Sequence, residues 1–304
     1  MSATADRRAR IDALGYAYEA RELEPVVECN LCGGVHHVEV SRTDRYGFAA
    51  VFRVCALCGL GFLGPRMTSR EYGEFYTGTY RPLVSAYHGR TIDAETVQVE
   101  QREYAADLVD FLRAHLPAHV DDVLDLGGST GIVAAAVRDA FGAAATVLDP
   151  APAELEVAAA AGMETIEGFA EEIDVGGRQW QLVLLCQTID HLLDIAATLA
   201  AMHGLLAPGG WAFVDVLDVD FMARRRGSIE GAVKIDHPYY LTRATALAYF
   251  VRAGLSVVAE RMSDDGHWGF LLARAEPGEP DWARLRRGAD ALLATCWQLR
   301  AKSR

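Results

Sequence analysis

The sequence has no run of about 18 consecutive apolar residues, the length from which a membrane-spanning helix is expected. Its first residues, MSATADRRARIDALG, carry charges throughout, whereas a secretory signal peptide needs an apolar segment near its start. We therefore expect neither a membrane partner nor a signal peptide, and we expect a cytoplasmic protein.

Basic residues are also scarce. The 304 residues include 29 Lys and Arg against 42 Asp and Glu, which gives a formal net charge of −13. A protein that binds nucleic acid broadly needs a basic face to neutralise phosphates. We therefore expect no nucleic-acid partner. The hydrophobic content of 51% is enough for one large α/β core and a smaller module.

Only six cysteines occur, and four of them form two closely spaced pairs. The pairs Cys29-x-x-Cys32 and Cys55-x-x-Cys58 place four thiolates on two facing turns, as a tetrahedral structural zinc ion requires. Two disulfides would need an oxidising compartment, and a redox C-x-x-C normally occurs once, beside a βαβ unit. Four sulfur ligands leave no open position, so we expect the zinc to be structural, with iron as the alternative metal.

A glycine-rich turn joins an apolar run to a helical segment at residues 123–140. The turn follows Asp125 and contains Gly127 and Gly131. Glycines let the backbone approach a ligand closely, and the N–H groups that begin the helix offer a partial positive charge. The G-G-x-x-G spacing differs from the dinucleotide fingerprint and favours a nucleoside over a pyrophosphate. A turn that only connects a strand to a helix is the alternative.

The next apolar run ends in Asp149 and Pro150, about 20 residues after the turn, where doubly wound sheets place the carboxylate that takes ribose hydroxyls. From residue 122 onward, strand-length runs alternate with helical segments, which indicates a parallel sheet. The carboxyl ends of such strands form the crevice that binds ligands. We expect strands at 123–126, 145–148, 163–166, 181–186 and 211–216, then a hairpin of 255–261 and 268–274.

At these residues the chain resembles the class I S-adenosylmethionine-dependent methyltransferases, whose first motif reads acidic-x-Gly-x-Gly-x-Gly. Ser129 stands where the motif has its middle glycine. The resemblance implies a Rossmann-like α/β fold, mostly parallel with an antiparallel final hairpin, and S-adenosylmethionine as cofactor. Asp149 would hold the ribose, the glycine turn the methionine end, and Phe169 would lie near the adenine. The predicted cofactor-binding residues are Asp125, Gly127, Gly131, Asp149, Pro150, Phe169 and Gln187.

We divide the chain into five parts: an arm (1–25), a zinc-binding module (26–66), a helical linker or lid (67–117), the S-adenosylmethionine-binding domain (118–276) and a C-terminal helix (277–304). The aromatic residues of the linker either dock the zinc module or cover the ligand. They are Tyr72, Phe75, Tyr76, Tyr80 and Tyr87. The run GLGFLG at 59–64 matches a dinucleotide fingerprint but has no βαβ unit around it, so we expect it only to turn the chain near the metal.

The segment from Lys234 to Thr242 contains the candidate catalytic pair, Asp236 and His237. Methyl transfer to a hydroxyl or an acidic C–H group needs a base. His237 is the predicted base because imidazole titrates near neutral pH, and Asp236 would orient or charge it. His191 is a second candidate for catalysis or substrate contact, with a packing role as the alternative.

A narrower resemblance is to the sugar C-methyltransferases, which methylate keto-deoxysugar nucleotides after removing a proton next to the ketone. The resemblance rests on the double C-x-x-C module, the Gln-Thr-x-x-His element at 187–191 and the acidic-His pair. It implies that the catalytic residues of the family correspond to Gln187, His191, Asp236 and His237. The family commonly has Tyr where this chain has Lys234. It also has a further domain after the hairpin, where only residues 277–304 follow here.

The sequence therefore predicts a methyltransferase that acts by C-methylation on a small molecule, a sugar or another natural-product intermediate. The narrower resemblance implies a nucleotide-sugar as its partner. O-methylation needs the same base and is the first alternative. A scaffold protein that retains the fold and an RNA methyltransferase guided by the zinc module are the others. No sequence pattern specifies an oligomeric state.

Overall fold

The computed structural model describes residues 3–92 and 94–302, and the chain forms two compact units. Unit 1 contains residues 1–97, 218–245 and 282–304, and unit 2 contains residues 98–217 and 246–281. Residues 218–245, which follow the fifth predicted strand, thus cluster with the N-terminal segment.

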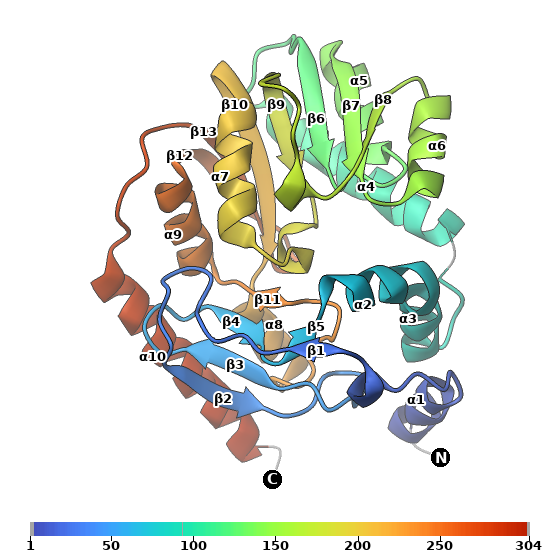
Figure 1. Ribbon diagram of the computed structural model, residues 1–304, viewed down its shortest axis with the longest axis vertical. Coiled ribbons are helices and arrows are strands. Elements are labelled where there is room, and N and C mark those ends of the chain that lie inside the picture. Colours follow the sequence, from blue (N-terminus) through green and yellow to red (C-terminus); the bar gives the residue numbers. More distant parts are fainter. Residues whose placement is uncertain (1–2, 93, 303–304) are drawn as a thin grey trace. The chain divides into compact units, whose positions relative to one another are not determined.

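Unit 2 is built on a seven-stranded sheet with the order β12-β13-β10-β9-β6-β7-β8 (Figure 1). The five strands from β10 to β8 in this order run parallel, whereas β13 is antiparallel to β10 and β12 is antiparallel to β13. This is the predicted mostly parallel sheet with an antiparallel final hairpin. Its strands are β6 (Asp122–Leu126), β7 (Ala144–Asp149), β8 (Glu164–Glu167), β9 (Trp180–Leu185), β10 (Leu206–Leu217), β12 (Leu255–Met262) and β13 (His267–Arg274).

Helices cover both faces of this sheet, with α7 on the near side and α4 on the far side in Figure 1. Apolar side chains of α4, α5 and α6 form one buried cluster with those of the strands, including Leu108, Val137 and Leu182. Burial of such side chains contributes roughly 1.5–3 kcal/mol each. The helices are α4 (Ala94–Arg113), α5 (Ile132–Phe141), α6 (Pro152–Ala160), α7 (Ile195–Leu205) and α9 (Arg243–Ala253).

Local sequence explains where several of these elements end. α5 begins after Gly131 and ends before Gly142, and both glycines have positive φ angles. Thr242 caps α9, because its hydroxyl oxygen accepts a hydrogen bond from the Thr245 N–H at 3.3 Å. The strand predicted to begin at 211 begins instead at Leu206, since the Pro-Gly-Gly turn is an irregularity within β10.

Unit 1 contains a four-stranded antiparallel sheet in the order β11-β4-β3-β2 and a two-stranded ribbon of β1 and β5. The strands are β1 (Leu23–Glu24), β2 (His37–Ser41), β3 (Phe52–Cys55), β4 (Gly61–Leu63), β5 (Arg66–Met67) and β11 (Tyr239–Tyr240). The helices are α1 (Ala3–Asp12), α2 (Ser69–Glu74), α3 (Tyr80–His88), α8 (Val219–Arg226) and α10 (Trp282–Lys302). A π-helix at Phe75–Thr79 joins α2 to α3.

The C-terminal helix α10 packs against β2, β3 and α8. Gly59 makes the close approach possible, because a Cβ atom there would lie only 3.1 Å from the Ala289 Cα atom, and its φ angle is +82°. The GLGFLG run therefore turns the chain after the second cysteine pair and enters β4.

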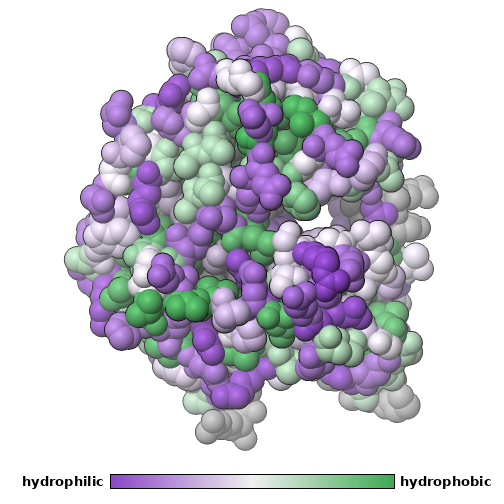
Figure 2. Space-filling view, in the orientation of Figure 1, coloured by the Kyte–Doolittle hydropathy of each residue, from purple (hydrophilic) through white to green (hydrophobic). Residues whose placement is uncertain are grey.

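None of the helices in the described part of the chain is long and apolar enough to cross a membrane. Figure 2 shows hydrophilic residues spread over the visible face, with apolar residues in small groups among them.

Candidate functional site

The turn after β6 has the backbone that close approach to a ligand requires. Gly127, Ser129 and Gly131 have φ angles of 72°, 52° and 76°, in the left-handed region. Ser129 thus adopts the conformation that the motif assigns to a glycine. A Cβ atom on Gly128 would lie 2.7 Å from an Asp125 carboxylate oxygen. We call this turn the cradle. The Asp125 side chain lies against it, and the rest of its surface is formed by its own backbone atoms.

Asp149, the last residue of β7, is linked directly to this turn. One of its carboxylate oxygens accepts the Ser129 N–H at 2.9 Å, and the other accepts the Ala151 N–H at 2.9 Å. Burial raises the pKa of Asp149, and these two N–H groups oppose the rise. Each oxygen retains a lone pair for a ligand hydroxyl, because a carboxylate offers about four acceptor positions.

Asp125 is almost completely buried, and neither of its oxygens has a hydrogen-bond partner among the described residues. Burial and, to a lesser extent, the charge on Asp149 together raise its pKa to about 7. A buried carboxyl group without a donor is expensive unless a ligand supplies one. The positively charged end of an amino-acid-like ligand would do so.

Gln187 follows β9 and also has a positive φ angle, 52°. Its N–H group donates to the Asp215 carboxylate on β10, whose second oxygen accepts the Tyr104 hydroxyl at 2.9 Å. Burial raises the pKa of Asp215 to about 6. Sequence reasoning missed Asp215 and Tyr104, which hold the predicted residue Gln187 in an otherwise unfavourable conformation.

The turns after β6 and β9 are in contact. A Cβ atom on Gly127 would lie 2.9 Å from the Thr188 methyl group, so glycine is required where the turns meet. Phe169, after β8, exposes 44% of its surface, as a residue that stacks on a ligand would. His191 lies in a short 3-10 helix after β9, and its backbone N–H donates to the Thr188 carbonyl at 2.9 Å. The predicted cofactor residues and His191 therefore all lie in unit 2, at or after strand ends.

Asp236 and His237 lie in unit 1, in the loop before β11. Both are buried, with exposed fractions of 0% and 4%. The His237 Nε2 atom is 3.4 Å from an Asp236 carboxylate oxygen, and the Lys234 Nζ atom is 3.6 Å from the same oxygen. The Tyr76 hydroxyl donates to the Asp236 carbonyl at 2.8 Å. The acidic-His pair is thus a paired, water-excluded group rather than two surface side chains.

Further buried groups fix the backbone of this loop. The Asp44 carboxylate accepts the Ile235 N–H at 3.1 Å, and burial raises the pKa of Asp44 to about 7. The Tyr240 hydroxyl accepts the Lys234 N–H at 2.7 Å and donates to the Lys234 carbonyl at 2.6 Å. The Tyr72 hydroxyl donates to the Ile235 carbonyl at 3.2 Å. Two of the aromatic residues of the predicted linker therefore anchor the loop that carries His237.

The four paired cysteines come together in unit 1. The Sγ atoms of Cys29 and Cys58 are 3.5 Å apart, those of Cys32 and Cys55 are also 3.5 Å apart, and all four lie within 4.8 Å of one another. Four sulfurs at about 2.3 Å from a zinc ion in a tetrahedron would be about 3.8 Å apart. The sulfur positions therefore fit a four-thiolate metal site.

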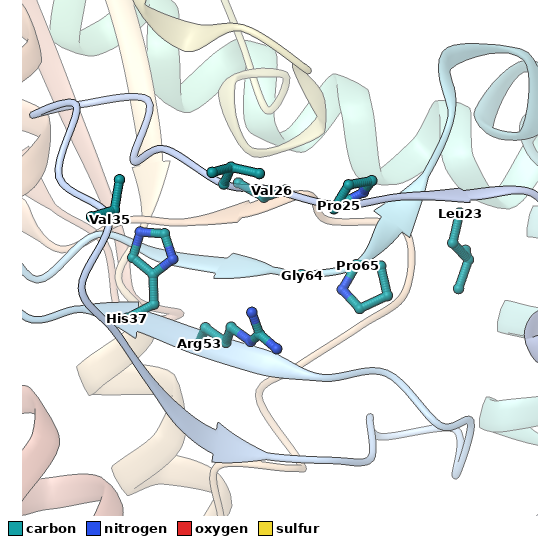
Figure 3. Close-up of a pocket in the computed structure, with 9 residues that line it drawn as sticks. Leu23, Pro25, Val26, Val35, His37, Arg53, Gly64 and Pro65 are labelled. Carbon is teal, nitrogen blue, oxygen red and sulfur yellow. The ribbon is translucent and has the colours of Figure 1, made fainter.

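Unit 1 also has a surface pocket of about 460 Å³, in which His37 and Arg53 project from β2 and β3 towards the segment with Pro25 and Val26 (Figure 3). It contains none of the predicted cofactor, catalytic or metal residues, and we assign no chemistry to it.

The fold and the cradle after β6 define a class I S-adenosylmethionine-dependent methyltransferase. The model of a family described as methyltransferase domain matches residues 97–260, and the chain belongs to this family. Its membership makes the protein an enzyme, so the scaffold interpretation is not retained.

A ubiquinone biosynthesis O-methyltransferase from Methylobacterium nodulans is 29% identical over 116 residues, which cover 35% of this chain. The match covers 45% of that relative, so the chain spans less than half of its length.

Two solved structures share the fold. The magnesium protoporphyrin IX methyltransferase of Synechocystis PCC 6803 with bound SAH has a TM-score of 0.53 and 13% identity, and the match covers 68% of this chain and 100% of that one. The mitomycin 7-O-methyltransferase has a TM-score of 0.52 and 18% identity, over 67% of this chain and 60% of that one.

Proposed function

We propose that the protein transfers a methyl group from S-adenosylmethionine to a carbon atom of a small molecule, a sugar or another natural-product intermediate, with His237 as the general base. The buried Asp236–His237 pair is the observation that carries this proposal. When bound, S-adenosylmethionine supplies an electrophilic methyl group, and the acceptor must present a lone pair to it.

His237 suits the role of base for a physical reason. Its imidazole is buried, and an Asp236 carboxylate oxygen lies 3.4 Å from Nε2. A neighbouring carboxylate stabilises the imidazolium that forms when the ring accepts a proton. The Lys234 Nζ atom lies 3.6 Å from the same oxygen, so Asp236 is shared between the ammonium group and the imidazole. His191 is proposed as a substrate contact.

The residues of unit 2 would hold the cofactor. Asp149 would accept hydrogen bonds from the ribose hydroxyls, and the backbone from Gly127 to Gly131 would enclose the methionine end of the cofactor. Asp125 would face the charged ammonium group of that end, and Gln187 would close the site. Replacing Asp149 with Ala is expected to abolish micromolar binding of S-adenosylhomocysteine in calorimetry, because the ribose hydroxyls would lose their carboxylate acceptor and the Ser129 N–H would lose the oxygen that it donates to.

O-methylation is the second candidate, favoured by the identity shared with the ubiquinone biosynthesis O-methyltransferase. Deuterium exchange separates the two. A C-methyltransferase that removes a proton next to a ketone should exchange that proton for deuterium in D₂O with S-adenosylhomocysteine present, whereas an O-methyltransferase should not. Keto-sugar nucleotides and simple keto-sugars are the first acceptors to try.

The base is tested with His237→Ala. We expect turnover to fall by about 10²–10⁴ while the affinity for S-adenosylhomocysteine stays the same, since His237 is proposed to contact the acceptor and is not one of the predicted cofactor-binding residues. His36→Ala, which removes an exposed imidazole, is the matched control and should retain full activity. Full turnover by a folded His237→Ala enzyme would exclude His237 as the base.

We also propose that Cys29, Cys32, Cys55 and Cys58 bind a structural zinc ion. The proposal is supported by the gathering of the four sulfurs within 4.8 Å of one another and by the preference of zinc for closed four-thiolate sites.

A further inference from the structure

Arginines gather around Tyr87 on α3, in unit 1. The guanidinium carbon of Arg7, on α1, lies 4.3 Å from the centre of the Tyr87 ring, and that of Arg45, after β2, lies 4.4 Å from it. The two positive charges can therefore be no more than 8.7 Å apart, the sum of these distances. The ring face stabilises each cation, but it does not neutralise either one.

In the part of the chain that the structure describes, no carboxylate lies within ion-pair distance of these guanidinium groups, although Asp236 attracts Arg45 at longer range. Among residues 3–92 and 94–302, neither Arg7, Arg45 nor Arg226, the last residue of α8, forms an ion pair with an acidic side chain. The Nε atoms of Arg7 and Arg45 are buried and have no hydrogen-bond partner among the described residues. The chain has 42 acidic and 29 basic residues, so it contains enough carboxylates to pair with these arginines. Buried N–H donors without an acceptor cost free energy unless a ligand satisfies them.

The pKa shifts of Tyr87 and His88 agree with this gathering of arginines. Burial would raise the pKa of Tyr87, but Arg45, Arg7 and Arg226 outweigh it and lower that pKa. Burial lowers the pKa of His88, and Arg45, Arg90, Arg226 and Arg7 lower it further. The charged groups that act most on both side chains are therefore all arginines, and the local potential is positive although the protein is acidic overall.

We propose that Arg7 and Arg45 form an anion site that takes the phosphate group of a small molecule. Guanidinium groups present planar pairs of N–H donors that match phosphate oxygens. The Tyr87 ring holds both guanidinium groups in place. If the proposed function is correct, the phosphate would belong to a nucleotide-linked acceptor; that assignment rests on the proposed function, whereas the anion site does not.

The site is tested by calorimetric titration of the full-length protein with inorganic phosphate, pyrophosphate and uridine diphosphate at constant ionic strength. We expect pyrophosphate to bind, and we expect Arg7→Gln and Arg45→Gln each to weaken binding at least about tenfold. Both side chains are only partly buried, so these substitutions should leave the core intact. Arg286→Gln removes the same charge from an exposed position on α10, where Arg286 faces Asp290, and should bind as the wild type does.

Tighter binding of uridine diphosphate than of pyrophosphate supports a nucleotide-linked ligand, and equal affinities support a free inorganic anion at the same site. Absence of binding to all three probes by the folded wild type overturns the proposal, as does equal weakening by Arg286→Gln. Each sample is also titrated with S-adenosylhomocysteine. Retained cofactor binding with no anion binding places the failure at this site alone, and loss of cofactor binding concerns the proposed function instead.

Discussion

Asp125 is a buried carboxyl group whose protonation changes close to neutral pH. Burial and the nearby Asp149 raise its pKa to about 7, so in the free protein the charged form increases between pH 6 and pH 8. Only the charged form attracts the ammonium group of S-adenosylhomocysteine. We therefore expect its affinity to rise roughly tenfold from pH 6 to pH 8 and to level off above, as measured by calorimetry at several pH values.

The matched variant for this prediction is Asp125→Asn, which keeps the shape of the side chain and removes its titration. Its affinity should be weak and nearly independent of pH over the same range. If wild type and variant show the same pH profile, Asp125 is not the group that couples protonation to cofactor binding.

At the scale of residues, sequence predicts best where a local pattern carries the chemistry. The places of Asp125, Gly127 and Asp149 at strand ends and in the turn could be predicted, because the spacing of strand, turn and helix fixes them locally; their roles in cofactor binding stay predictions. Asp215 and Tyr104 could not, because their hydrogen bond joins residues 111 positions apart. The positive φ angle of Gln187 was equally hidden, since glutamine gives no signal for that conformation.

The hydrogen bond from Tyr104 connects an element outside the sheet, α4, to β10 and through Asp215 to the turn after β9. Removing the hydroxyl with Tyr104→Phe leaves a buried carboxylate one donor short and loosens the turn that holds Gln187. We expect the free energy of unfolding to fall by about 1–3 kcal/mol, measured by urea denaturation, and we expect S-adenosylhomocysteine to bind more weakly.

Tyr16→Phe is the matched control, because the Tyr16 hydroxyl donates to the Met67 sulfur at 3.4 Å, a weak acceptor, and to no other group among residues 3–92 and 94–302. This change should alter stability by less than about 0.5 kcal/mol and leave cofactor binding unchanged. Similar small effects for both substitutions would mean that the contact between Tyr104 and Asp215 does not support the turn.

At the scale of elements, apolar periodicity predicted the parallel strands and the final hairpin, whose turn closes with a hydrogen bond from the Ser263 N–H to the His267 carbonyl at 2.8 Å. It did not predict β11, because two residues are too short to show a period and the strand exists only by pairing with β4. The start of β10 was wrong for a similar reason. Pro208 and the glycines after it signal a turn locally, but pairing with β9 resumes on both sides of them.

At the scale of the whole molecule, the order of the sequence hides the composition of the two units. Unit 1 is assembled from segments before, within and after the part of the chain that forms unit 2. The contact between Asp44 and Ile235 spans 191 positions, a separation over which composition and periodicity carry no information. The sequence could therefore predict the cysteine site and the acidic-His pair separately, but not that both belong to unit 1.

Because all four paired cysteines lie in unit 1, removal of the metal should affect the stability of that unit. The four cysteines link the segment before β2 to the end of β3 in unit 1, whereas the core of unit 2 has no cysteine ligand. Metal binding to a four-thiolate site is folding free energy for the unit that contains it. Treating the full-length protein with a zinc chelator should therefore lower the unfolding temperature of unit 1, while the transition that S-adenosylhomocysteine stabilises stays in place.

Scanning calorimetry with and without S-adenosylhomocysteine, together with elemental analysis, measures both effects, and adding zinc back should restore the first transition. A protein purified without metal, or an equal loss of both transitions, would contradict the assignment of a zinc ion that stabilises unit 1 alone.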